Sequence, residues 1–146
     1  MLATLPHLEK IEFPSINRLG METLQVNLGY RCNLQCKHCH VNAGPNRTET
    51  MSVDNIATII SLADHGLFNT LDLTGGAPEL HPQFHELVTA VRERGIHVID
   101  RCNLTILEES GQEGLADFLA EQGVEIVASL PCYLQENVDA QRGKGV

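Results

Sequence analysis

A repeated alternation of strand-like and helix-like segments constrains the fold of this chain more than any other feature. The strand-like segments are short and rich in β-branched and apolar residues: 22–28, 68–74, 96–100 and 124–130. The helix-like segments lie between them: 51–66, 82–95 and 108–123. Strands joined through helices form parallel pairs, with helices on one or both faces of the sheet. The sequence therefore predicts an α/β fold with a parallel sheet of about four strands.

The helix-like segments carry recognisable start and stop signals. Ser52 is the predicted N-cap of the first, and Gly66 stands where a glycine would end it. Its predicted buried stripe repeats at helical spacing: Val53, Ile56, Ala57 and Ile60. Pro82 is placed at the first helical position of the second segment, which Gly95 closes. The predicted buried face of that second helix is Phe84, Leu87, Val88 and Val91. Glycines at 111 and 114 weaken the start of the third.

Unusual loops follow the predicted strands. The first strand is followed by a cysteine-rich loop, and the later loops begin with "GGAP" (75–78), "DRCN" (100–103) and "LPCY" (130–133). Parallel sheets with helical crossovers place functional groups in the loops after the carboxyl ends of their strands. We therefore expect these loops to meet at one site.

The cysteine-rich loop contains Cys32, Cys36 and Cys39 in a C-x3-C-x2-C spacing, interleaved with His38 and His40. A structural zinc site takes four ligands in a closed tetrahedron, and adjacent Cys39 and His40 would struggle to bind one ion. A [4Fe–4S] cluster that only transfers electrons is normally held by four cysteines. Three cysteines leave one iron free to bind a substrate or cofactor, unless Cys102 is a fourth ligand. Three unrelated buried thiols are the plain alternative.

Charge and composition disfavour several classes of protein. The 146 residues have a formal net charge of −9 and scattered Lys and Arg, which disfavours a nucleic-acid reader. No run approaches the roughly 18–20 apolar residues that span a bilayer, and the N-terminus lacks signal-peptide features. We predict a cytoplasmic protein, a setting in which clustered cysteines more often bind metal than form disulfides.

The cysteine spacing directly after the first strand of a βα series resembles the radical S-adenosylmethionine (radical SAM) superfamily. The resemblance implies a partial (β/α)6 barrel, with a [4Fe–4S] cluster on Cys32, Cys36 and Cys39. It implies that the open iron chelates SAM, which a reduced cluster cleaves to methionine and a 5′-deoxyadenosyl radical. It also implies an electron donor such as flavodoxin or ferredoxin.

Further motifs extend the resemblance to SAM-binding positions. The segment "TGGAPEL" resembles the family's GGE motif, with Ala77 in place of the usual glutamate and Glu79 as a candidate to compensate. The segment "DRCNLTIL" resembles "TNGTLL", with Leu104 in place of glycine. His38 stands at the family's adenine-facing position, and "ENVDAQRGKG" resembles its "HDxIRG" stretch. The implied SAM-binding residues are His38, Thr74, Gly75, Gly76, Ala77, Asn103, Ser129 and Arg142.

The longer strings "CHVNAGPNRTE", "LDLTGGAPEL" and "VASLPCYLQENVDAQRGKG" resemble the arsenosugar biosynthesis radical SAM proteins, which carry a Cys-rich C-terminal domain. This resemblance implies transfer of a deoxyadenosyl group from SAM to a methylated trivalent arsenical. Thiolates prefer soft centres such as trivalent arsenic, so Cys102 and Cys132 are hypothetical substrate contacts. Alternatively, they are small packing residues or ligands of something in a missing domain. A radical SAM protein with another substrate, a simple electron carrier, and a non-catalytic zinc or iron–sulfur binding module also fit the cysteine motif.

The predicted domain organisation is an irregular lead-in over 1–21 and a radical SAM core over 22–146. A six-unit barrel needs about two more strands and helices than the sequence supplies. We expect the barrel to be truncated after about four parallel strands, without the C-terminal strands and the Cys-rich domain. Such a fragment need not be active as an enzyme.

Overall fold

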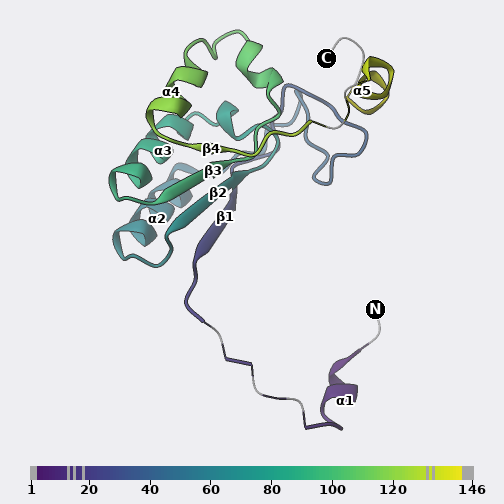
Figure 1. Ribbon diagram of the computed structural model, residues 1–146, viewed down its shortest axis with the longest axis vertical. Coiled ribbons are helices and arrows are strands. Elements are labelled where there is room, and N and C mark those ends of the chain that lie inside the picture. Colours follow the sequence, from purple (N-terminus) through teal and green to yellow (C-terminus); the bar gives the residue numbers. More distant parts are fainter. Residues whose placement is uncertain are drawn as a thin grey trace.

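The computed structural model describes residues 3–12, 14, 16–17, 19–130, 132 and 134–142. Its centre is a parallel sheet in the order β1-β2-β3-β4 (Figure 1). The strands are β1 Thr23–Asn27, β2 Thr70–Thr74, β3 His97–Asp100 and β4 Glu125–Ile126. The predicted parallel α/β sheet is therefore confirmed. The fourth strand is shorter than predicted, although Val127 N still donates to Asp100 O at 2.9 Å and Ser129 N to Cys102 O at 2.8 Å.

The helices α2, α3 and α4 lie along one face of the sheet (Figure 1). They are α2 Val53–Asp64, α3 Phe84–Glu93 and α4 Leu115–Glu121. Each connects neighbouring strands in sequential order, and right-handed crossovers in one direction place all such helices on the same side. Four sequential parallel strands covered on one face form the arrangement of a partial barrel, as predicted.

The remaining elements were not predicted. They are α1 Leu5–Leu8, α5 Gln135–Arg142, and the 3-10 helices η1 Pro78–Leu80 and η2 Thr105–Glu108. The described residues of the lead-in are exposed and extend away from the sheet (Figure 1). None of the helices in the described part of the chain has the length and apolar character needed to cross a bilayer.

Helix α2 begins and ends as predicted but buries a different stripe. Ser52 Oγ accepts a hydrogen bond from Asn55 N at 3.3 Å, and Gly66 adopts a φ of +61°. Val53 is 64% exposed and Ala57 is also exposed, so the predicted stripe is wrong at these positions. Val53 lies in the first turn of the helix, and the neighbouring stripe belongs to the hydrophobic core. The buried residues of α2 are Ile56, Ile59 and Ala63.

Helix α3 buries the face that its sequence predicted, and its start differs. The buried residues are Phe84, Leu87, Val88 and Val91. Pro82 precedes the helix, which begins at Phe84, because Gln83 N bonds back to His81 Nδ1 at 3.1 Å in a turn. Helix α4 starts only after Gly114, which has a φ of +87°. Side chains of α2, α3 and α4 pack with the buried face of β2 and β3 in one core.

Candidate functional site

A cavity of about 500 Å³ lies at the carboxyl ends of the strands, where the sequence predicted that the loops converge. The three cysteines of the motif line it. The other predicted site residues in its lining are His38, Thr74, Gly75, Gly76, Asn103, Ser129 and Arg142. Positions separated by more than 100 residues in the sequence therefore share one cavity, which is large enough for a cofactor.

The cysteine loop directs N–H groups at two of its sulfur atoms. Cys32 is 7% exposed and accepts hydrogen bonds from Leu34 N at 3.4 Å and Asn103 Nδ2 at 3.7 Å. Cys39 Sγ accepts one from Ala43 N at 3.3 Å. Hydrogen bonds to sulfur stabilise thiolates and tune the potentials of iron–sulfur clusters. Cys32, Cys36 and Cys39 form no disulfide, so all three are available as ligands.

Burial raises the pKa of the Cys32 thiol, and the neighbouring Cys36 and Cys39 raise it further. Burial also raises the pKa of Cys36, against which the Arg142 guanidinium acts. Without metal, the thiols of Cys32 and Cys36 are therefore protonated at neutral pH. Metal binding at these cysteines must release protons, as is usual for thiolate sites.

The spacing of the sulfur atoms fits a cluster better than a single ion. Tetrahedral zinc with bonds of about 2.3 Å places its sulfur ligands about 3.8 Å apart. Among the described residues, the group whose ligand atoms all lie within 4.8 Å of one another is Glu79, Asp100 and Cys102, not the motif cysteines. Three soft thiols around an open cavity, more widely spaced than one zinc requires, fit a polynuclear iron–sulfur group.

The glycine pair after β2 holds the cysteine loop in place. Gly76 N donates to Gly29 O, and Ala77 N donates to Arg31 O, both at 2.9 Å. A Cβ on Gly75 would lie 2.6 Å from Gly29 O, and one on Gly76 would overlap the Arg31 carbonyl. These glycines therefore permit a close backbone contact between two loops, a role that the sequence analysis did not assign to them.

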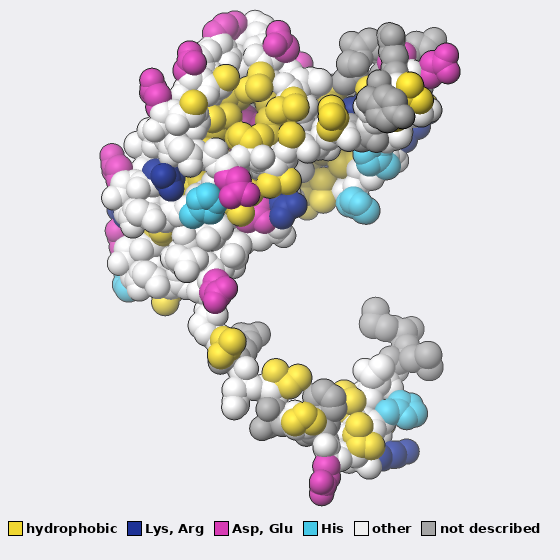
Figure 2. All heavy atoms as spheres, in the orientation of Figure 1, with side chains coloured by type: hydrophobic (Ala, Val, Ile, Leu, Met, Phe, Trp, Pro, Cys, Tyr) yellow, Lys and Arg dark blue, Asp and Glu magenta, His cyan; other side chains and the backbone are white. Residues whose placement is uncertain are grey.

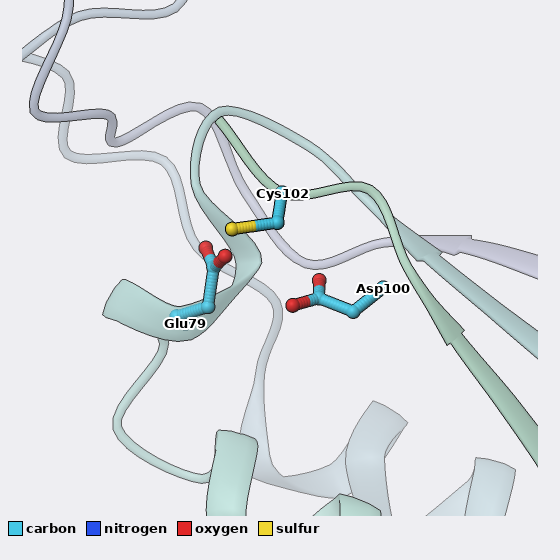
Figure 3. A group of neighbouring side chains, drawn as sticks. All are labelled: Glu79, Asp100 and Cys102. Carbon is cyan, nitrogen blue, oxygen red and sulfur yellow. The ribbon is translucent and has the colours of Figure 1, made fainter. Parts of the chain in front are cut away.

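Ala77 and Glu79 lie outside the lining of the cavity. Ala77 is buried, and Glu79 is 3% exposed. The 3-10 helix η1 turns the Glu79 side chain into the interior, beside Asp100 and Cys102 (Figure 3). The expectation that Glu79 compensates for the missing glutamate at position 77 is therefore wrong.

The loop after β3 is bonded to the cysteine loop through side-chain amides. Asn103 Nδ2 donates to Asn33 Oδ1 at 2.9 Å, and Asn33 Nδ2 donates to Thr105 Oγ1 at 2.9 Å. Leu104 has a φ of +47°, in the left-handed region that favours glycine. Leu104 therefore adopts a conformation that a glycine at this position would adopt more readily.

Ser129 and Arg142 lie together in the cavity wall. Arg142 Nη2 donates to Ser129 Oγ at 2.9 Å and also to the Ser129 carbonyl. Arg142 is 7% exposed, and its Nε has no hydrogen-bond partner among the described residues. Lys37 N donates to Gln141 O at 3.0 Å, which ties the cysteine loop to α5. A buried guanidinium therefore lies in the cavity, near the thiols.

The sequence analysis missed Arg101, which also lines the cavity. Its Nε and Nη2 donate to the two carboxylate oxygens of Asp72, each at 2.8 Å. Gln25 Nε2 donates to the same carboxylate at 2.8 Å. The Arg101 bonds hold the pKa of Asp72 below its usual range. Its position directly after β3, at the start of a loop expected to carry functional groups, could have predicted that Arg101 belongs to the site.

Cys102 and Cys132, the hypothetical substrate contacts, do not line this cavity. Cys102 is 1% exposed and lies beside Glu79 and Asp100 (Figure 3). Cys132 Sγ accepts hydrogen bonds from Leu134 N at 3.4 Å and Asn137 Nδ2 at 3.5 Å, at the start of α5. The structure does not bring these two thiols together with the three of the motif.

Comparisons with known proteins agree with this geometry. A profile described as the radical SAM superfamily matches residues 26–135. The antilisterial bacteriocin subtilosin biosynthesis protein AlbA of Bacillus subtilis (strain 168) is 30% identical over 118 residues, covering 80% of this chain and 26% of AlbA. A "Probable GTP 3′,8-cyclase" of Sulfolobus acidocaldarius is 29% identical over 76 residues, covering 52% of this chain and 24% of that protein. The chain spans about a quarter of the length of these curated relatives.

Solved structures share the fold. Streptococcus suis SuiB bound to S-adenosylmethionine aligns with a TM-score of 0.69 and 17% identity, covering 86% of this chain and 28% of SuiB. SuiB bound to its precursor peptide SuiA gives the same TM-score. Proteins of this superfamily use a [4Fe–4S] cluster and SAM, and the three thiols on the cavity fit that cofactor pair. The chain belongs to the radical SAM superfamily.

Proposed function

We propose that this chain forms the cofactor-binding core of an enzyme that reductively cleaves SAM. One observation carries the proposal: the thiols of the C-x3-C-x2-C motif line the same cavity as the glycine loop, Asn103 and Arg142. When bound, a reduced [4Fe–4S] cluster would supply one electron to the SAM sulfonium, giving methionine and a 5′-deoxyadenosyl radical. The domain assignment, a radical SAM core over 22–146 after a lead-in, is part of this proposal.

Three thiolates and one open position define the proposed cluster site. Cys32, Cys36 and Cys39 would each bind one iron and leave the fourth iron for SAM. Cys102, the candidate fourth ligand, lies in a separate buried cluster and does not line the cavity. Its placement favours an open iron over a fully ligated electron carrier.

The proposed SAM contacts use the remaining lining residues. Arg142 supplies a positive charge and a free Nε–H for the SAM carboxylate, and it is oriented by Ser129. His38 offers a ring to the adenine, and Asn103 offers an amide beside Cys32. Backbone groups of 74–76 can approach the amino group closely. Ala77 is buried and would act only through the main chain.

The substrate is the second part of the proposal. The motif strings favour a methylated trivalent arsenical and the making of an arsenosugar precursor, with flavodoxin or ferredoxin as the electron donor in the cytoplasm. The named relatives act in subtilosin biosynthesis and, by name, on GTP, while SuiB binds a peptide. A radical SAM enzyme with another substrate is therefore the second candidate. The buried position of Cys102 gives the arsenical no contact at that thiol.

The test is low-temperature EPR of anaerobically reconstituted and reduced protein, with and without SAM. A [4Fe–4S]+ signal that changes on adding SAM is expected. Cys36→Ala should remove the signal, whereas the matched control Cys132→Ala should keep it. A signal that SAM leaves unchanged would refute the open iron. The proposal that the chain is part of an enzyme would be refuted if the protein formed no cluster and instead bound stoichiometric zinc that is lost in Cys36→Ala.

A further inference from the structure

We propose that Glu79, Asp100 and Cys102 form a second metal site, which holds a buried divalent transition metal ion such as Zn2+. This site is separate from the cluster cysteines and does not depend on the proposed SAM chemistry. It lies on the helix-covered face of the sheet, whereas the cluster cavity opens at the ends of the strands.

The three side chains converge from different elements. Glu79 belongs to η1, Asp100 ends β3, and Cys102 follows two residues later. Their ligand atoms all lie within 4.8 Å of one another, and Figure 3 shows the two carboxylates and the thiol pointing toward a common centre. All three residues are at least 97% buried. The geometry is that of a compact set of three ligands, which leaves one position of a tetrahedral ion for water or a second carboxylate oxygen.

The carboxylates lack the partners that buried charges require. All four oxygens, Oε1 and Oε2 of Glu79 and Oδ1 and Oδ2 of Asp100, have no hydrogen-bond partner among the described residues. Buried polar groups are almost always hydrogen-bonded, and buried charges are paired or bind metal. Without metal, Glu79 can meet this need only by sharing protons with Asp100 and Cys102, whereas a bound positive ion would meet it directly.

No side-chain cation in the described part of the chain neutralises this cluster. The guanidinium of Arg101 is bound to Asp72, and the other ion pairs lie elsewhere. Burial raises the pKa of Asp100 to about 8 and that of Cys102 to about 12, so without metal the cluster retains protons. A divalent cation would replace those protons and balance two of the three negative charges that the deprotonated ligands carry.

The mixed donor set selects the kind of ion. Ca2+ and Mg2+ take oxygen ligands, whereas a thiolate beside carboxylates suits a borderline ion such as Zn2+. Leu104 N donates to Cys102 Sγ at 3.3 Å, as N–H groups commonly do toward metal-bound thiolates. The positive φ of Leu104 accompanies this hydrogen bond. Bound metal would join η1 to the end of β3 from inside the fold.

A route to the site lies under α4. Cys102 borders a cavity of about 290 Å³, which is otherwise lined by apolar residues of η2, α4 and the segment around β4. Figure 2 shows these apolar side chains gathered over α4 and β4 on the visible face. The ion could enter here, or during folding, without passing through the cluster cavity.

The first experiment isolates the site from the motif cysteines. In the full chain carrying Cys32→Ala, Cys36→Ala and Cys39→Ala, we expect one zinc per chain and, after Co2+ substitution, a near-ultraviolet thiolate-to-cobalt absorption band. Adding Cys102→Ser should abolish both, while adding Cys132→Ser should leave both intact. Absence of metal in the folded triple variant, or equal loss in the Cys132→Ser control, would overturn the proposal.

A thermal denaturation series separates a metal site from a pair of carboxyl groups that only share protons. If metal binds, Zn2+ raises the Tm of the triple-alanine background with concentration, because it binds the folded state alone. Asp100→Asn in that background should remove this Zn2+-dependent rise. Two results together would overturn the proposal. The Tm of the triple-alanine background would not change with Zn2+, and Asp100→Asn would raise the Tm because it removes a buried carboxyl group. The same series with the cluster-loaded native chain checks that both metals bind together.

Discussion

Replacing Gly76 by alanine tests whether the close contact between the β2 loop and the cysteine loop positions the cluster ligands. The new Cβ would overlap the Arg31 carbonyl oxygen and lie 2.7 Å from its carbon and 3.0 Å from the Tyr30 carbonyl carbon. These neighbours are backbone atoms, so no side-chain rotation can relieve the overlap. One of the two loops must move.

The expected magnitude combines two broken hydrogen bonds with one steric overlap. Moving the loops apart disrupts the hydrogen bonds from Gly76 N to Gly29 O and from Ala77 N to Arg31 O. Each contributes about 1 kcal/mol, and overpacking a tight contact costs about 1–3 kcal/mol more. The total is about 3–5 kcal/mol, a large share of the roughly 5–15 kcal/mol by which domains are stable.

The assay compares Gly76→Ala with Gly44→Ala, a matched control in the cysteine loop itself. A Cβ on Gly44 makes only ordinary contact with the Gln35 side chain, at 3.6 Å. Iron and sulfide per chain after reconstitution should fall sharply in Gly76→Ala and stay normal in Gly44→Ala. The free energy of unfolding of the metal-free chain should likewise be lower in Gly76→Ala than in Gly44→Ala. Equal behaviour of the two variants would refute the assigned role of the glycine.

Other perturbations test the site and the core. Asp72→Asn should reduce the loss of folding stability at acid pH. The lowered pKa of Asp72 stabilises the fold above about pH 4, and this contribution is lost as the pH falls through the pKa that Asp72 has in the folded state. Denaturant melts between about pH 2 and 6 measure it, and an unchanged limb would contradict the Arg101 pair. Asn103→Ala removes an N–H donor from the buried cluster thiol, so a redox titration should find a more negative cluster potential; no shift would contradict the contact. Ile59→Ala should lower the free energy of unfolding by about 2–5 kcal/mol and Val53→Ala by less than about 0.5 kcal/mol, and similar losses would contradict the assigned face of α2.

The strand order and the convergence of the loops were predictable because they depend on long-range rules. Alternating strand and helix segments leave few alternatives to a parallel sheet, and such a sheet collects the loops after its strands at one edge. The buried face of α3 was predictable because its apolar period is strong. The α2 face was not, since adjacent stripes of that helix are both apolar, and only the docked sheet decides between them.

The errors after β3 have one physical cause. Successive side chains of a strand point to opposite faces, and this alternation continues past Asp100. Asp100 and Cys102 therefore point into the core, while Arg101 between them is exposed to the cavity. Treating the whole loop as part of the cavity placed Cys102 wrongly and overlooked Arg101. Continuing the alternation of side chains past the end of the strand would have assigned Cys102 to the core and Arg101 to the cavity.

The hydrogen bonds that shape the cysteine loop also determine when it can form during folding. The motif is local in sequence, but Asn33 is bonded to Asn103 and Thr105, about 70 residues later, and Lys37 is bonded to Gln141. Contacts between distant residues form slowly, because the long loop between them must close first. As the chain leaves the ribosome, its three thiols are exposed well before their supports are synthesised. The supported form of the cysteine loop is therefore complete only late in folding, after the segments following β3 and α5 have docked.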